Sequence, residues 1–120
     1  DRRMVVAQSD GCAPVVKAFQ NHQDATNFWH KSNTIALGLN VPGPLGGYWI
    51  LEILLESNGI AVTAKETSLE MYTQNFRKKI GIDACTEIGV VWSAYEELTE
   101  KNWITPGEKI ILFATGIERR

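Results

Sequence analysis

Three short runs of apolar residues, rich in valine and isoleucine, divide the chain into alternating segments. They cover residues 4–7, 60–63 and 110–114, and polar or glycine residues bound each run. An unbroken apolar run of about four to eight residues is typical of a strand that is covered on both faces, as in a parallel sheet. We therefore expect three buried, parallel strands.

A helix is predicted soon after the second run, because apolar residues recur there at helical spacing. Leu69 and Phe76 lie on the same predicted face, and Gly81 ends the pattern. Thr67 stands three positions before Glu70, which is the spacing of a capping box. The segment is expected to begin with that cap.

Three further helices are predicted, two from helical spacing of apolar residues and one from a proline. One covers residues 86–101, and another begins after the Gly-Gly pair at 46–47 and ends at residues 58–59, an Asn-Gly pair suited to a left-handed helix end. Pro14 suits the first position of a helix over residues 15–20, because proline has no amide hydrogen to lose there. This alternation predicts an α/β fold with three layers, a Rossmann-like, mainly parallel sheet with helices on both faces.

The irregular part of the chain is residues 21–45. It begins with a polar and aromatic stretch, Asn27, Phe28, Trp29 and His30, and continues with glycines and prolines. A loop of this length inside a compact domain is usually functional or packed against another part of the protein.

Composition and charge narrow the classes of function. The 120 residues suit one domain, and their formal charge of −2 offers no basic field for nucleic acid or anionic lipid. The apolar runs are far shorter than the roughly 20 residues of a membrane span, and no export signal is visible. We expect a cytoplasmic protein that binds neither nucleic acid nor membrane, with Cys12 and Cys85 as reduced thiols.

Candidate chemistry lies after the predicted strands, because open parallel sheets bind ligands beyond the carboxyl ends of their strands. Residues 9–12, 64–66 and 115–116 occupy those positions. Thr115 could donate a hydrogen bond into such a crevice, or could simply end its strand and bond to a neighbouring loop.

Other groups of residues indicate a functional site less clearly. The glycines at 46–47 could offer amides to a phosphate or form a structural turn. Residues 85–87 place a thiol, a hydroxyl and a carboxylate at a helix start, where either the helix dipole activates them or Thr86 caps the helix. Asp10 and Glu87 could form a carboxylate pair. The two histidines and two cysteines are not at zinc-ligand spacing, so no metal site is expected.

Taken in order, the strand ends resemble threonine synthase. The specific motifs are the strand and Gly-Cys-Ala-Pro turn within residues 4–19 and the closing strand with its Thr-Gly turn at 109–116. Residues 34–46 resemble the loop of that family, and residues 81–87 resemble its Cys-Pro-Glu helix start, with Thr86 where proline is usual. The resemblance spans nearly the whole chain.

The resemblance implies a fold-type II enzyme that uses pyridoxal 5'-phosphate to convert O-phospho-L-homoserine and water into L-threonine and phosphate. Thr115, followed by Gly116, would face the pyridine nitrogen of the cofactor with its hydroxyl. Gly11, Cys12 and Ala13 would line the cofactor ring, with Glu87 nearby, and Gly38 would border the substrate pocket.

The family's Schiff-base lysine and phosphate cradle belong to an amino-terminal part that has no counterpart in these 120 residues. Residues 1–120 would then be the carboxy-terminal unit of the large domain, without a catalytic residue of its own and inactive alone. Threonine dehydratase or cysteate synthase, or a stand-alone, non-catalytic α/β binding module, are the alternatives. A narrow sheet with open edges also predicts a homodimer.

Overall fold

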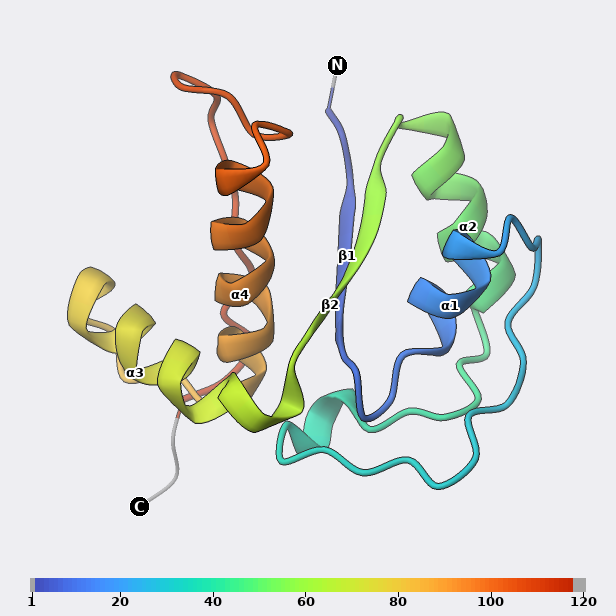
Figure 1. Ribbon diagram of the computed structural model, residues 1–120, viewed down its shortest axis with the longest axis horizontal. Coiled ribbons are helices and arrows are strands. Elements are labelled where there is room, and N and C mark those ends of the chain that lie inside the picture. Colours follow the sequence, from blue (N-terminus) through green and yellow to red (C-terminus); the bar gives the residue numbers. More distant parts are fainter. Residues whose placement is uncertain (1, 118–120) are drawn as a thin grey trace.

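In the computed structural model of the chain, which describes residues 2–117, two parallel strands form the middle layer (Figure 1). They are β1 (Val5–Ser9) and β2 (Ile60–Ala64). Their register pairs Val5 with Ile60 at one end and Ser9 with Ala64 at the other. Both strands therefore end at the same edge of the sheet.

Helices cover both faces of this sheet, which confirms the predicted layers. Figure 1 shows α1 (Pro14–Gln20) and α2 (Gly47–Glu56) on one side and α3 (Leu69–Ile80) and α4 (Thr86–Glu100) on the other. Two short 3-10 helices, η1 (Leu37–Leu39) and η2 (Glu66–Ser68), lie in the connections.

The alternation of side chains along the strands separates two parts of the core. Val6 and Ala61 pack in a cluster with α1 and α2, whereas Ala7 and Val62 pack in a cluster with α4. Successive residues of a strand point to opposite faces, so an uninterrupted apolar run serves both helical layers. This is the physical reason that the runs at 4–7 and 60–63 identify the two strands.

Helix ends agree with the sequence in three places and differ in a fourth. Gly81 ends α3 with a φ of 80°, Asn58 follows α2 with a left-handed φ of 55°, and Pro14 is the first residue of α1. The capping box was wrong, because residues 66–68 form η2 and α3 begins at Leu69 after Ser68, with no side-chain cap. The turn of η2 is fixed instead by Glu66, whose carboxylate accepts hydrogen bonds from Ser9 and Ile35.

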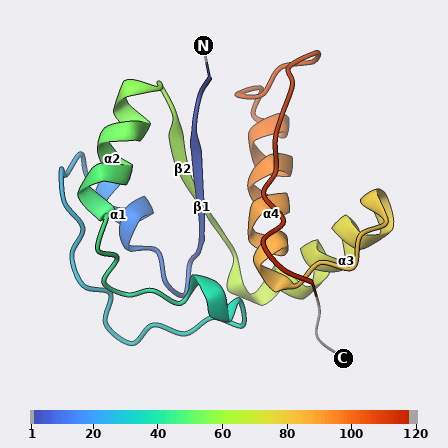
Figure 2. The same cartoon turned by 180° about the vertical axis from the view of Figure 1, so that it is seen from behind.

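The third predicted strand was also wrong: within the described part of the chain, residues 110–114 join no sheet. The segment runs along α4 instead (Figure 2). Leu112 packs against the cluster that contains Phe76 and Trp92, while Ile111 and Phe113 are 82% and 73% exposed. Apolar pattern alone could not decide this, because a strand also needs a neighbouring strand for its backbone hydrogen bonds.

Cys12 and Cys85 are both free thiols. Among the helices of the described residues, none combines the length and the apolar character that a membrane span requires.

Candidate functional site

The carboxyl ends of β1 and β2 are tied together by one carboxylate, that of Glu66. Ser9 donates its hydroxyl to Oε1 of Glu66, and the amide of Ile35 donates to Oε2 at 2.7 Å. The backbone amide of Glu66 donates in turn to Oδ1 of Asp10 at 2.9 Å. Glu66 thus joins the turn after β1, the end of β2 and the long loop.

Glu66 is held in its ionised form. Burial alone would raise the pKa of its carboxyl, but hydrogen bonds from Ser9, Thr34 and the Ile35 amide outweigh it and lower the pKa. The sequence placed residues 64–66 after a strand but gave Glu66 no role. The available signal was a carboxylate two positions after an apolar strand, separated from it by Lys65.

Glu87 and Gly38, which the resemblance placed near cofactor and substrate, are in direct contact. The Gly38 amide donates to Oε1 of Glu87 at 3.1 Å, and a Cβ on Gly38 would lie only 2.9 Å from the same oxygen. Burial favours a raised pKa for Glu87, but its hydrogen bonds with Cys85, Thr86 and backbone amides lower the pKa overall. Glu87 is an ionised carboxylate at the start of α4.

Thr86 does not cap α4, contrary to one interpretation of the sequence. Cys85 is the N-cap residue, and it makes no side-chain capping bond. The Thr86 hydroxyl instead lies 3.2 Å from the carbonyl oxygen of Ile35 and 3.3 Å from Oε2 of Glu87. It connects the helix start to the long loop.

Cys85 is joined to the end of the described chain. Its amide donates to the carbonyl oxygen of Gly116 at 3.2 Å, and a Cβ on Gly116 would lie 3.1 Å from Sγ of Cys85. Burial, followed by the neighbouring Glu87 carboxylate, raises the pKa of the Cys85 thiol. The thiol is therefore kept protonated, and the helix dipole does not activate it here.

Thr115 precedes this contact and is exposed. Within residues 2–117, its side chain makes no hydrogen bond. The alternative in which Thr115 bonds to a neighbouring loop therefore does not describe this structure. Its hydroxyl is free to donate to or accept from a ligand.

Gly11, Cys12 and Ala13 lie at the start of α1 and are covered. A Cβ on Gly11 would overlap the carbonyl oxygen of Asn33, whose amide donates to the Gly11 carbonyl at 3.1 Å. Cys12 is fully buried, which raises the pKa of its thiol, and Ala13 is 2% exposed. The loop, rather than a ligand, occupies the space beside Gly11.

The remaining candidates do not assemble into a site. Asp10 bonds to the Glu66 amide, and its carboxylate has no contact with Glu87 in the described chain. A Cβ on Gly47 would lie 2.7 Å from the hydroxyl of Thr26, which favours a tightly packed turn over a phosphate loop. No cluster of three or more potential metal ligands occurs among residues 2–117.

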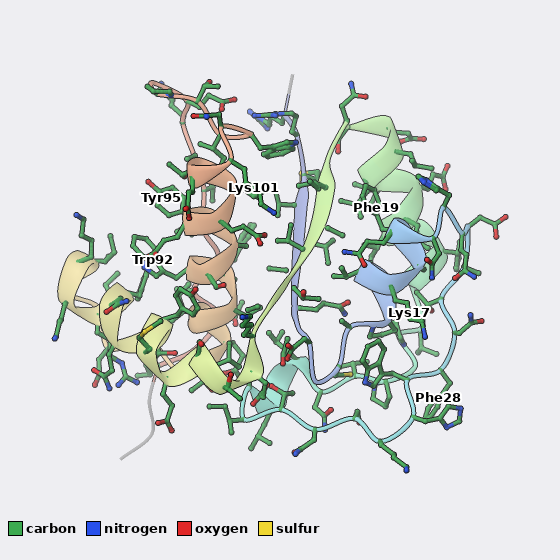
Figure 3. The ribbon with its side chains drawn as sticks, in the orientation of Figure 1. Lys17, Phe19, Phe28, Trp92, Tyr95 and Lys101 are labelled. Carbon is green, nitrogen blue, oxygen red and sulfur yellow. The ribbon has the colours of Figure 1, made fainter. Side chains whose placement is uncertain are left out.

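Two cavities lie away from the strand ends (Figure 3). One, of about 300 Å³, lies between α1 and the long loop, where its walls include Pro14, Lys17, Ala18, Phe28, Trp29 and His30. The other, of about 510 Å³, lies between α3 and α4 and is lined by Asn75, Lys78, Lys79, Trp92, Tyr95 and Glu96. Neither cavity contains a site residue that the resemblance implied.

Comparison with known proteins identifies a fold. No family model matches the chain, and no curated protein matches it either. Among solved structures, serine racemase from maize superimposes with a TM-score of 0.75 at 14% sequence identity. The match covers 98% of this chain and 35% of the racemase chain. The chain therefore has the α/β fold of about a third of the length of that racemase, a parallel sheet with helices on both faces.

Proposed function

We propose that the chain is part of a fold-type II pyridoxal-phosphate enzyme that acts on an amino acid. The main observation that supports this proposal is the superposition of 98% of this chain on a serine racemase, an enzyme of that class. The motifs that resemble threonine synthase point to the same class from the sequence, independently of the three-dimensional comparison. The chain would supply the carboxy-terminal unit of the large domain.

Within that class, the order of the motifs along the chain and the residues that form them favour threonine synthase. The Gly-Cys-Ala-Pro turn at 11–14 and the Thr-Gly turn at 115–116 both follow the segments expected in that family. The proposed reaction is the conversion of O-phospho-L-homoserine and water into L-threonine and phosphate. Threonine dehydratase and cysteate synthase are the rival activities.

The residues of this chain fit the cofactor on one side only. Thr115 has an exposed hydroxyl with no partner among the described residues, as a donor to a pyridine nitrogen requires. Bound pyridoxal phosphate supplies an electron sink, and a neutral hydroxyl partner leaves its ring nitrogen largely unprotonated. Gly116 holds Thr115 beside the start of α4, because its carbonyl oxygen accepts the Cys85 amide and the Cys85 sulfur packs where a side chain would stand.

Gly11, Cys12 and Ala13 do not fit the role of lining an open ring site as they stand, because Asn33 fills the space beside Gly11. Glu66 and Glu87 both anchor the covering loop, at Ile35 and Gly38 respectively. A cofactor could reach the backbone of Gly11 only after residues 33–38 had moved. We therefore assign this chain no step of the reaction.

The test uses both the 120-residue chain and the longest protein that its gene encodes. We expect the chain alone, incubated with pyridoxal phosphate and borohydride, to form no site-specific lysine adduct and to release no phosphate from phosphohomoserine. The parent protein is expected to turn over phosphohomoserine, in preference to threonine or to phosphoserine with sulfite. Turnover of another of these substrates would reassign the activity within the class.

A gene that encodes only this chain, without a cofactor lysine, would contradict the enzyme proposal and leave the stand-alone binding module. Sedimentation of the chain tests the proposed homodimer, because a strict monomer at high concentration would exclude it.

A further inference from the structure

The long loop, residues 21–45, has no role in the proposed function. It forms a cavity against α1. The aromatic half of the loop is held in place from two sides: the Trp29 amide donates to the Pro42 carbonyl at 2.9 Å, and a Cβ on Gly43 would lie 3.3 Å from the Phe28 ring. Trp29 also packs against the core cluster of α1 and α2. The Gly-Pro half of the loop thus supports a preformed aromatic wall.

The walls of this cavity combine aromatic surface with positive charge. The Lys17 ammonium lies 5.8 Å from the centre of the Trp29 ring, and the rings of Phe28 and His30 meet edge to face at 5.0 Å. Lys17 makes no ion pair within residues 2–117, and no acidic side chain lines the cavity. An unpaired ammonium beside aromatic faces attracts an anion that also carries a flat apolar surface.

The segment that closes the cavity starts at the end of α1. His22, just after that helix, has a φ of 56°, and the amides of His22 and Gln23 donate to the carbonyl oxygens of Phe19 and Ala18, which is a common left-handed cap of a helix end. Lys31, directly after the aromatic stretch, has the same φ. A left-handed turn therefore stands before and after the segment that closes the cavity.

We propose that this cavity is a binding site for a small aromatic carboxylate. The carboxylate would contact the Lys17 ammonium, and the ring would lie against Trp29 and Phe28. A volume of about 300 Å³ suits a ligand with one ring, at the lower end of small-molecule sites. The site is separate from the strand ends, so it does not depend on the proposed enzyme function.

The experiment titrates the ¹⁵N-labelled 120-residue chain with benzoate and with benzyl alcohol, its neutral analogue. Ligands of this size are expected to bind at around millimolar concentration. We expect benzoate to shift the indole N–H signal of Trp29, and benzyl alcohol to bind about five- to tenfold more weakly, as loss of a charge-assisted contact predicts. Trp29→Phe, which removes that signal, assigns it.

Three variants decide the role of the named groups. Lys17→Gln should weaken benzoate binding about five- to tenfold and erase the preference over benzyl alcohol. Phe28→Ala, at a side chain that is 60% exposed, should weaken both ligands without unfolding the chain. Lys31→Gln is the matched control, because this neighbouring lysine does not line the cavity.

Equal benzoate affinity in the wild type and Lys17→Gln, or equal losses in Lys17→Gln and Lys31→Gln, would overturn the proposal. A shift of the Trp92 signal alone would place the binding in the cavity between α3 and α4 and would also overturn it. No shift of the Trp29 signal at saturating benzoate would have the same consequence.

Discussion

The end of the molecule where a cofactor is proposed has a closed half, at the ends of β1 and β2, and an open half, beside the start of α4. On the closed half, residues 33–38 are fastened by Glu66 and Glu87 and cover Gly11. On the open half, Thr115 is exposed, and the carbonyl oxygen of its neighbour Gly116 accepts the Cys85 amide. The closed half is built for stability and the open half is accessible to a ligand, although the sequence treated both as equivalent strand ends.

The largest effect is expected at Glu66, the anchor of the closed half. Glu66→Ala leaves the buried Ser9 hydroxyl without its acceptor, which costs about 1–3 kcal/mol, and removes the exposed hydrogen bond from the Ile35 amide, which is worth about 0.5–1.5 kcal/mol. We expect a loss of about 2–4 kcal/mol in the free energy of unfolding, measured by urea denaturation. Glu70→Ala, on the exposed surface of α3, is the control and should change it by less than about 0.5 kcal/mol.

The second prediction concerns the cover over Gly11. Gly11→Ala forces a Cβ into the Asn33 carbonyl oxygen and should cost about 1–3 kcal/mol in the free energy of unfolding. Gly46→Ala is the matched control, since a Cβ there meets nothing within 4 Å, and it should be neutral or slightly stabilising. If both variants unfolded at the same urea concentration, the loop would not cover the turn tightly.

The third prediction uses acid to loosen the closed half. The pKa values of Glu66 and Glu87 are lowered by their hydrogen bonds, so each contributes stability above the ordinary value of 4.5 and loses it as the pH falls through the folded-state pKa. The stability difference between wild type and Glu66→Gln should therefore be largest near neutral pH and shrink below about pH 4.5. A difference that stayed constant from pH 7 to about pH 3 would contradict this.

The smallest effect is expected on the open half. Thr115→Ala should change the free energy of unfolding by less than about 0.5 kcal/mol, because its exposed hydroxyl has no partner in the described chain. The same substitution at Thr34, which is buried and accepts the Ala36 amide at 3.1 Å, should cost about 1–2 kcal/mol. Equal losses at the two threonines would show that Thr115 is structural after all.

The candidate site was only partly readable from the sequence. Gly38 and Glu87 are 49 positions apart and meet through a 3.1 Å hydrogen bond, and the resemblance implied that both lie near the site. Glu66 was overlooked because its importance depends on Ser9 and Ile35, which are 57 and 31 positions away. No local pattern encodes which amide a carboxylate will accept.

Sequence by itself determined the elements whose causes are local. The unbroken apolar runs at 4–7 and 60–63, the helical spacing of Leu69 and Phe76, and the left-handed turn at Gly81 identify two strands and a helix with its end. Only the tertiary structure decided that residues 110–114 lie against α4 and that Asn33 covers Gly11. Both outcomes depend on which distant segment is available as a neighbour, because backbone hydrogen bonds and close packing need a partner that periodicity does not specify.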